Sequence, residues 1–218
     1  MADTGVDLFA ISQSQFGIAR THWGPDGKGS DSWRPWNTVD TEVADSNRGA
    51  PGLSGSNAIN LACARNLCGA NAGSLQLCQV QGVGERRLYH ALRRPDGRWS
   101  PFVDVMNAVP AGGTPAYISL VAVAVVNEDL HVCAIDANGG GRLYHTVRLA
   151  DGTWPHPFED VITAVLVQNP GSIDPGLVSS VKCAAVFGEL HLMVGGSSQI
   201  LYTVRHADGT WKPFVNVI

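Results

Sequence analysis

The sequence predicts an all-β protein in which one antiparallel unit occurs four times. The first observation is an internal repeat, whose copies lie at 18–39, 87–105, 142–161 and 200–217, the first of them degenerate. The second is a tryptophan that begins a W-x-P-aromatic motif in each copy, at intervals of 66, 55 and 57 residues: Trp33, Trp99, Trp154 and Trp211. The third is composition, because 25 glycines, 12 prolines and only 16% charged residues favour turns over solvated helices.

Each copy contains short apolar runs bounded by Gly, Asn, Asp and Pro, which are typical of strands. The predicted inner strands are 59–65, 117–126 and 178–187, and the predicted second strands are 7–13, 74–81, 129–137 and 189–195. The third strand carries the L-Y-H type sequence, and the fourth carries the W-x-P-F motif. Asp-Gly steps supply the positive φ of a tight hairpin between these last two strands, at 26–27, 96–97, 151–152 and 208–209.

Proline and hydrophobicity order these strands within a sheet. Proline cannot donate to a ladder, so the W-x-P-F strand is expected at the outer edge. The run 118–126, ISLVAVAVV, is apolar on both faces and belongs near a central axis, where neighbouring sheets cover it. Four such sheets describe a β-propeller of four antiparallel blades, one domain over 1–218 with repeats at about 7–40, 58–105, 116–161 and 177–218. The segments 41–57, 106–116 and 163–176 are predicted inter-blade loops.

The first copy begins directly at its second strand, so the first blade is expected to have three strands. The missing inner strand would leave backbone donors and acceptors unpaired at an apolar axis. The sequence therefore predicts either a closed four-bladed ring with one three-stranded blade, which is favoured, or a homodimer in which a second chain covers the open edge.

Charge and hydropathy limit the partners. The net charge of −4 includes no basic cluster, so nucleic acid is not expected as a partner. The longest apolar run is about half of the roughly 20 residues that a membrane helix needs, and no export signal is visible. The expected location is the cytoplasm, or release without a signal peptide. Five cysteines without a CxxC pair favour reduced thiols over a disulfide framework.

The repeated signature resembles the tandem-repeat β-propeller lectins of bacteria and fungi, of the tectonin and fucose-binding propeller type. The resemblance covers about 200 residues in architecture and motif style. It implies sugar binding in clefts between adjacent blades, with aromatic and arginine side chains on each blade. The D-G-x-W step differs from the Asp box of sialidases, because its Asp and Gly are adjacent, so sialidase chemistry is not implied.

Two columns of the third strand contain the candidate ligand-binding residues. Three residues before the turn Asp lie Arg93, Arg148 and Arg205, and six residues before it lie His90, His145 and Tyr202, where the first copy has Arg20. A guanidinium offers five donors, and an indole face offers a surface on which a sugar stacks, so each arginine is matched with Trp99, Trp154 or Trp211. The alternative is structural: the arginines pair with Asp104 and Asp160 of the next blade, and the tryptophans fill the wedges between blades.

Metal ligation and catalysis have weaker support. His131 and His191 lie on second strands, but their equivalents in the other copies are Phe9 and Gln76, so no metal or other cofactor is predicted. Four cysteines (Cys63, Cys78, Cys133 and Cys183) align with apolar positions and are expected in the core, whereas Cys68 lies in a loop. No catalytic motif is recognisable.

The sequence thus predicts a carbohydrate-binding propeller, not an enzyme, with several similar sites for glycans or another small-molecule ligand. Two alternatives stay open. One is an enzyme with an axial or first-blade active site, where Arg20, His22 and Trp23 precede the turn KGSDS at 28–32. The other is a protein-interaction scaffold that uses the long loops.

Overall fold

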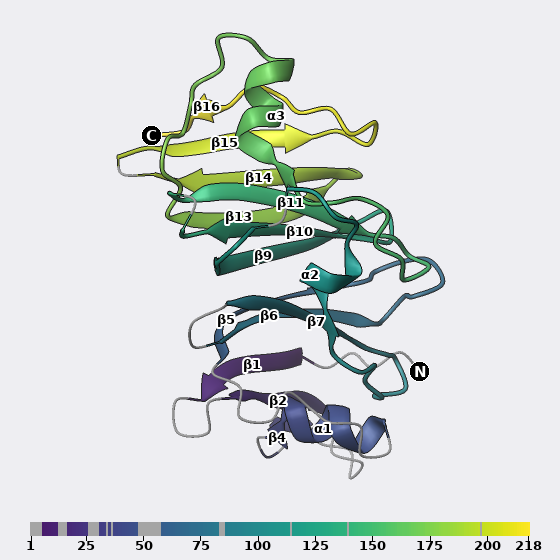
Figure 1. The fold of residues 1–218 in the computed structure, drawn as a ribbon. Coiled ribbons are helices and arrows are strands. Elements are labelled where there is room, and N and C mark those ends of the chain that lie inside the picture. Colours follow the sequence, from purple (N-terminus) through teal and green to yellow (C-terminus); the bar gives the residue numbers. More distant parts are fainter. Residues whose placement is uncertain are drawn as a thin grey trace.

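The computed structural model describes residues 6–12, 17–25, 31–33, 35, 37–47, 58–82, 86–113, 115–138, 140–196 and 198–218. These residues form four antiparallel sheets that follow one another along the chain and lie side by side (Figure 1). The first sheet contains β1 (Val6–Ser12), β2 (Gly17–Pro25), β3 (Asp31–Trp33) and β4 (Asn37–Thr38). The predicted all-β class is confirmed.

The other three sheets share one strand order, from the inner to the outer edge. The second sheet contains β5 (Ala58–Arg65), β6 (Leu75–Gln81), β7 (Arg87–Arg93) and β8 (Val103–Asp104). The third contains β9 (Ile118–Val126), β10 (Asp129–Asp136), β11 (Arg142–Arg148) and β12 (Glu159–Asp160). The fourth contains β13 (Ser180–Val186), β14 (Glu189–Gly195), β15 (Ile200–Arg205) and β16 (Val215–Asn216).

The first sheet is three strands wide, as predicted. Both β3 and β4 pair with the same strand, β2, one after the other along its outer side. The equivalent of β3 in two later sheets is a single bridge, Arg93 to Trp99 and Arg205 to Trp211. Strand β1 therefore occupies the position of a second strand and, among the described residues, has no inner neighbour in its own sheet.

The hairpin turns follow from their Asp-Gly steps. Gly97, Gly152 and Gly209 have φ of +88°, +98° and +91°, which side-chain-bearing residues rarely adopt. The preceding aspartate stabilises each turn, because its Oδ1 accepts a hydrogen bond from the amide two residues later, as between Asp151 and Thr153 at 2.8 Å. The first predicted step, 26–27, lies outside the described residues.

Three helices begin directly after outer strands of the described chain, where the sequence analysis expected loops. They are α1 (Val39–Ser46), α2 (Val105–Ala108) and α3 (Val161–Gln168). Asp104 and Asp160 cap the last two, because each Oδ1 accepts from a backbone amide of the first turn at 3.0 and 3.1 Å. The loop prediction was wrong at these residues. Each helix is short and buries only one or two valines, so its apolar pattern in the sequence is weak. None of the described helices is long and apolar enough to span a membrane.

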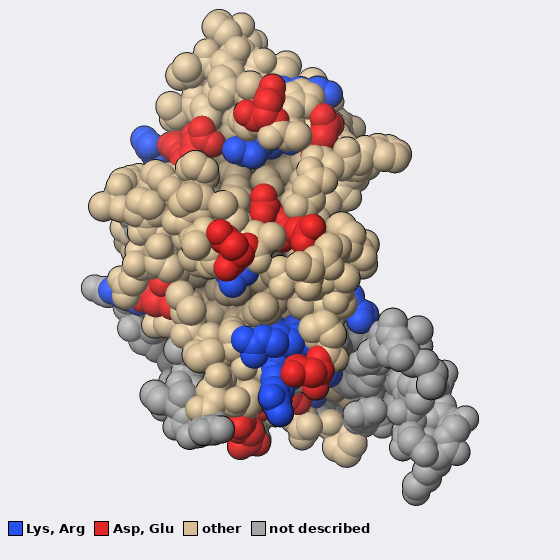
Figure 2. Space-filling view, turned by 90° about the vertical axis from the view of Figure 1, so that its right-hand side faces the viewer, with Lys and Arg blue, Asp and Glu red and all other residues tan. Residues whose placement is uncertain are grey.

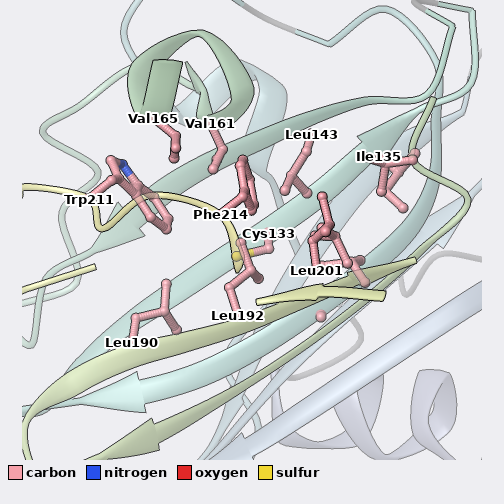
Figure 3. Close-up of a cluster of buried hydrophobic side chains, with 14 of the residues drawn as sticks. Cys133, Ile135, Leu143, Val161, Val165, Leu190, Leu192, Leu201, Trp211 and Phe214 are labelled. Carbon is pink, nitrogen blue, oxygen red and sulfur yellow. The ribbon is translucent and has the colours of Figure 1, made fainter. Parts of the chain in front are cut away.

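Among the described residues the core consists of three apolar clusters, each between neighbouring sheets. The third cluster lies between the third and fourth sheets, and Figure 3 shows Val161 and Val165 of α3 pointing into it toward Phe214. Strand β9 packs against both β5 and β13, which confirms the predicted inner position of this doubly apolar strand.

The closed ring that the sequence favoured is not formed by the described residues. The first and fourth sheets lie at opposite ends of the molecule (Figure 1). Closure depends on the angle between successive sheets, which the spacing of repeats does not determine. Self-association stays a prediction.

Candidate functional site

Two cavities lie between neighbouring sheets, and both are lined by an arginine at the end of a third strand. The N-terminal cavity, between the first and second sheets, has a volume of about 340 Å³ and is lined by Arg20, Thr21, Pro35, Asn37, Glu42, Asp45, Ser46, Arg93 and Gly97. The C-terminal cavity, between the third and fourth sheets, has a volume of about 180 Å³. It is lined by Val126, Asn127, Asp129, His131, Val147, Leu149, His156, Gly188, Leu190, Arg205, His206 and Ala207.

The three arginines of the predicted column occupy equivalent positions in successive sheets. Arg93, Arg148 and Arg205 end β7, β11 and β15, and each guanidinium lies over the glycine of the following turn. A Cβ at Gly152 would lie 2.9 Å from Nη2 of Arg148, so this glycine provides space for the guanidinium as well as the turn conformation. Two of the three arginines line the cavities described above, and Arg148 lines neither.

The N-terminal cavity contains a compensated pair of charges. Nη1 of Arg20 donates to Oε1 and Oε2 of Glu42 at 3.1 and 3.2 Å, and the Arg20 side chain is 9% exposed. The indole Nε1 of Trp99 also donates to Oε2 of Glu42, at 2.9 Å. Glu42 therefore joins the first sheet, through Arg20, to the outer edge of the second sheet.

The C-terminal cavity has an arginine and three histidines on its wall. Nδ1 of His131 hydrogen-bonds Nε2 of His145 at 3.0 Å. Burial, followed by the positive charge of Arg205, lowers the pKa of His131 to about 4, so its imidazole is neutral at pH 7. Nδ1 of His206 lies 2.5 Å from Oε1 of Glu189, and this hydrogen bond lowers the pKa of the glutamate.

The three predicted tryptophans lie in the core between sheets. Trp99, Trp154 and Trp211 are 1%, 8% and 3% exposed, which agrees with the wedge-filling alternative. The Trp211 ring packs edge-on against His145 of the preceding sheet, with 5.6 Å between centroids. The arginine of each Arg and Trp pair is half-buried and therefore more exposed than the tryptophan. A sugar-contacting role for these residues stays a prediction.

His90 and His145 of the His and Tyr column lie between sheets, whereas Tyr202 pairs with the exposed Met193 on the outer face of the fourth sheet. His90 and His145 are both 2% exposed, and Nε2 of His90 hydrogen-bonds Oε1 of Gln76 at 2.7 Å. The hydroxyl of Tyr202 hydrogen-bonds Nδ1 of His191 at 2.5 Å. Burial lowers the pKa of His90 to about 3 and that of His145 well below its ordinary value. The contacts of His90 and His145 agree with hydrogen-bonded histidines between blades. The described residues contain no group of three or more metal-ligating side chains.

Two expectations about pairing and burial were wrong. Asp104 and Asp160 bind Arg87 and Arg142 of their own sheets, at 2.7 and 3.0 Å, because the first residue of each third strand lies beside the outer strand. Cys63 is exposed instead of buried. Its side chain lies on the face of β5 that is turned toward the first sheet, where no inner strand covers it.

Sequence reasoning missed several cavity residues. Glu42 and Asp45 lie in a segment that was predicted as a loop, although the spacing of Val39 and Val43 was a signal of a helix with one buried face. Asp129 and His206 lie at strand ends and do not recur in the other copies. In the alternative first-blade site, Arg20 lines a cavity, but the side chains of His22 and Trp23 and residues 28–30 lie outside the described part of the chain.

The charged residues on one face of the molecule form small groups of both signs at several levels. Figure 2 shows Lys and Arg side chains beside Asp and Glu side chains there, with no large region of one sign. A ligand on this face therefore encounters local charge pairs rather than one extended field.

No protein-family model matches this sequence, and no curated protein matches it. Among solved structures, the BP39L lectin of Burkholderia pseudomallei is similar with a TM-score of 0.60 and 17% identity, over 98% of this chain and 52% of that one. The Trypanosoma rangeli sialidase has a TM-score of 0.53 and 12% identity, over 98% and 35% of the two chains.

A third similar structure is the Aleuria aurantia lectin, described as a six-bladed β-propeller with a novel fucose recognition mode. It has a TM-score of 0.50 and 9% identity, over 99% of this chain and 62% of that one. The chain thus spans less than two thirds of each of these three proteins. At such identities the likeness concerns the fold alone, and together with the sheet topology it shows that this chain has four blades of a β-propeller, the first of them three-stranded.

Proposed function

We propose that this chain is a lectin-like propeller that binds saccharides in cavities between neighbouring sheets. The observation that carries the proposal is the recurrence of one arrangement at two sheet boundaries, where Arg93 and Arg205 line a cavity from the same strand position. Two of the three similar structures are named as lectins, which supports the same function.

The cavity walls suit hydroxylated ligands. A saccharide hydroxyl both donates and accepts hydrogen bonds, so it is matched by guanidinium donors together with carboxylate, amide and hydroxyl acceptors. The N-terminal cavity offers such a mixture through Arg93, Asn37, Asp45 and Ser46. Sites of this size bind weakly one at a time, and presentation of several sites on one molecule increases the total strength toward clustered glycans.

A glycan array followed by titration with the best saccharides tests the proposal. We expect weak binding that falls in the Arg93→Ala and Arg205→Ala variants, because each removes the shared donor of one cavity. Arg98→Ala is the matched control, since Arg98 is exposed on a hairpin turn and lines neither cavity. No binding of any saccharide at millimolar concentration contradicts the proposal.

A further inference from the structure

The C-terminal cavity is lined by the half-buried Arg205, on which Glu159 and Asp208 act electrostatically. Arg205 forms no salt bridge with any residue in the described part of the chain. Its Nε atom is buried and has no hydrogen-bond partner there. A guanidinium carries its charge at any pH at which proteins are folded, and a buried donor without an acceptor is unfavourable. This end of the cavity is therefore suited to an anionic acceptor.

The carboxylates near Arg205 are already hydrogen-bonded to other groups. Their oxygens accept from the indole Nε1 of Trp211 at 3.3 Å (Glu159), from Thr210 at 2.9 Å (Asp208), from the amide of Ala150 at 2.8 Å (Asp129) and from His206 at 2.5 Å (Glu189). Of these four, Asp129 lines the cavity itself, and it disfavours an anion on its own side. A negatively charged ligand is thus directed toward Arg205.

The histidine beside Arg205 does not compete with it for the anion. His131 hydrogen-bonds His145 at 3.0 Å and is neutral near pH 7, because burial and the charge of Arg205 both lower its pKa. The dominant positive charge on this wall therefore belongs to Arg205.

We propose that the C-terminal cavity binds a carboxylate-bearing saccharide, that is, a uronic acid or sialic acid unit, with Arg205 holding the carboxylate. The inference rests on the proposed saccharide-binding function and names the substrate class of one cavity. The planar guanidinium presents paired donors that match the two oxygens of a carboxylate. A cavity of about 180 Å³ is matched to a single sugar unit rather than to an extended chain.

Titration of the full chain with matched sugars tests the inference. The probes are D-glucuronic acid against D-glucose and D-galacturonic acid against D-galactose, which differ only at C6, with N-acetylneuraminic acid as a further acidic probe. We expect at least one acidic sugar to bind about tenfold more tightly than the neutral sugars, and added salt to reduce the difference.

Three variants locate the preference. Arg205→Gln is expected to abolish it, and Arg205→Lys to retain part of it, because the charge remains but the paired donors do not. Arg98→Gln, on an exposed hairpin turn outside both cavities, is the matched control and leaves the preference unchanged. Circular dichroism shows whether each variant is folded, and if Arg205→Gln is not, Arg205→Lys and the salt dependence provide the same test.

The outcomes separate this inference from the proposed function. Equal binding of acidic and neutral sugars, or an acidic preference that survives Arg205→Gln, overturns the inference while saccharide binding stands. Absence of binding to every saccharide on the array overturns both.

Discussion

The two cavities differ in the charge of the residue at one equivalent position of the third strand. Arg20 at the N-terminal cavity lies against Glu42 of α1, whereas the third sheet has the neutral His145 at the Arg20 position. Helix α3, which begins at the corresponding point, has Ala164 where α1 has Glu42. A repeated scaffold can therefore change the charge of an inter-blade site by substituting one helix residue and one strand residue. Four experiments test this contrast.

The largest expected effect comes from Trp211 at the boundary of the third and fourth sheets. Trp211→Ala should lower the free energy of unfolding by about 3–5 kcal/mol, because it leaves a cavity in a cluster where the indole is 3% exposed. Urea unfolding measures the loss. Trp211→Phe fills most of the volume and should lose less, and a loss below about 1 kcal/mol for the alanine variant contradicts the structural role.

The second effect concerns the compensated charge of the N-terminal cavity. Glu42→Gln should cost about 2–3 kcal/mol, because it removes the carboxylate opposite Arg20, whose side chain is 9% exposed. Glu159→Gln is the matched control: Glu159 accepts from Trp211 Nε1 as Glu42 accepts from Trp99, but it acts on Arg205 without a salt bridge, so about 1 kcal/mol is expected. Equal losses in urea unfolding would show that Arg20 does not depend on Glu42.

The third effect is acid sensitivity at the boundary of the third and fourth sheets. The pKa of His131 is about 4 in the folded chain and about 6.5 when unfolded, so the unfolded state binds the proton first as the pH falls. Stability is therefore lost between about pH 6.5 and pH 4, by about 2 kcal/mol from this group between pH 7 and pH 5. His131→Gln should reduce that loss in urea unfolding at the two pH values, and an undiminished loss in this variant would contradict the role of His131.

The fold was predictable where local chemistry determines structure. Asp-Gly steps determine the hairpins, and an apolar run such as 118–126 determines a strand that is covered on both faces. The helices were missed because α2 has four residues and α3 is apolar through most of its length, so neither shows a clear amphipathic pattern.

The candidate site was predictable only in part. The arginine column recurs in three copies and could be read from the turn spacing. The cavities also contain Glu42, Asp129 and His131, which are brought there by the packing of neighbouring sheets. The sequence of a single repeat does not indicate which residues of two sheets will face each other. The contrast between the two cavities comes from such non-repeating residues.

The smallest expected effect tests whether charge pairs outside the cavities matter. Nη1 of Arg142 lies 3.0 Å from Oδ2 of Asp160, and the arginine side chain is 59% exposed, so solvent screens the pair. Arg142→Ala should cost at most about 1 kcal/mol in urea unfolding, less in high salt, and Arg87→Ala in the second sheet should behave alike. Asp160→Ala should cost more than Arg142→Ala, because the carboxylate also caps α3 by accepting from the amide of Thr163. If both changes at the Arg142–Asp160 pair cost the same, the cap contributes nothing measurable. If Arg142→Ala costs several kcal/mol, the exposed Arg142–Asp160 pair stabilises the fold as much as the Arg20–Glu42 pair of the N-terminal cavity. Burial would then not explain a difference in stability between the two pairs.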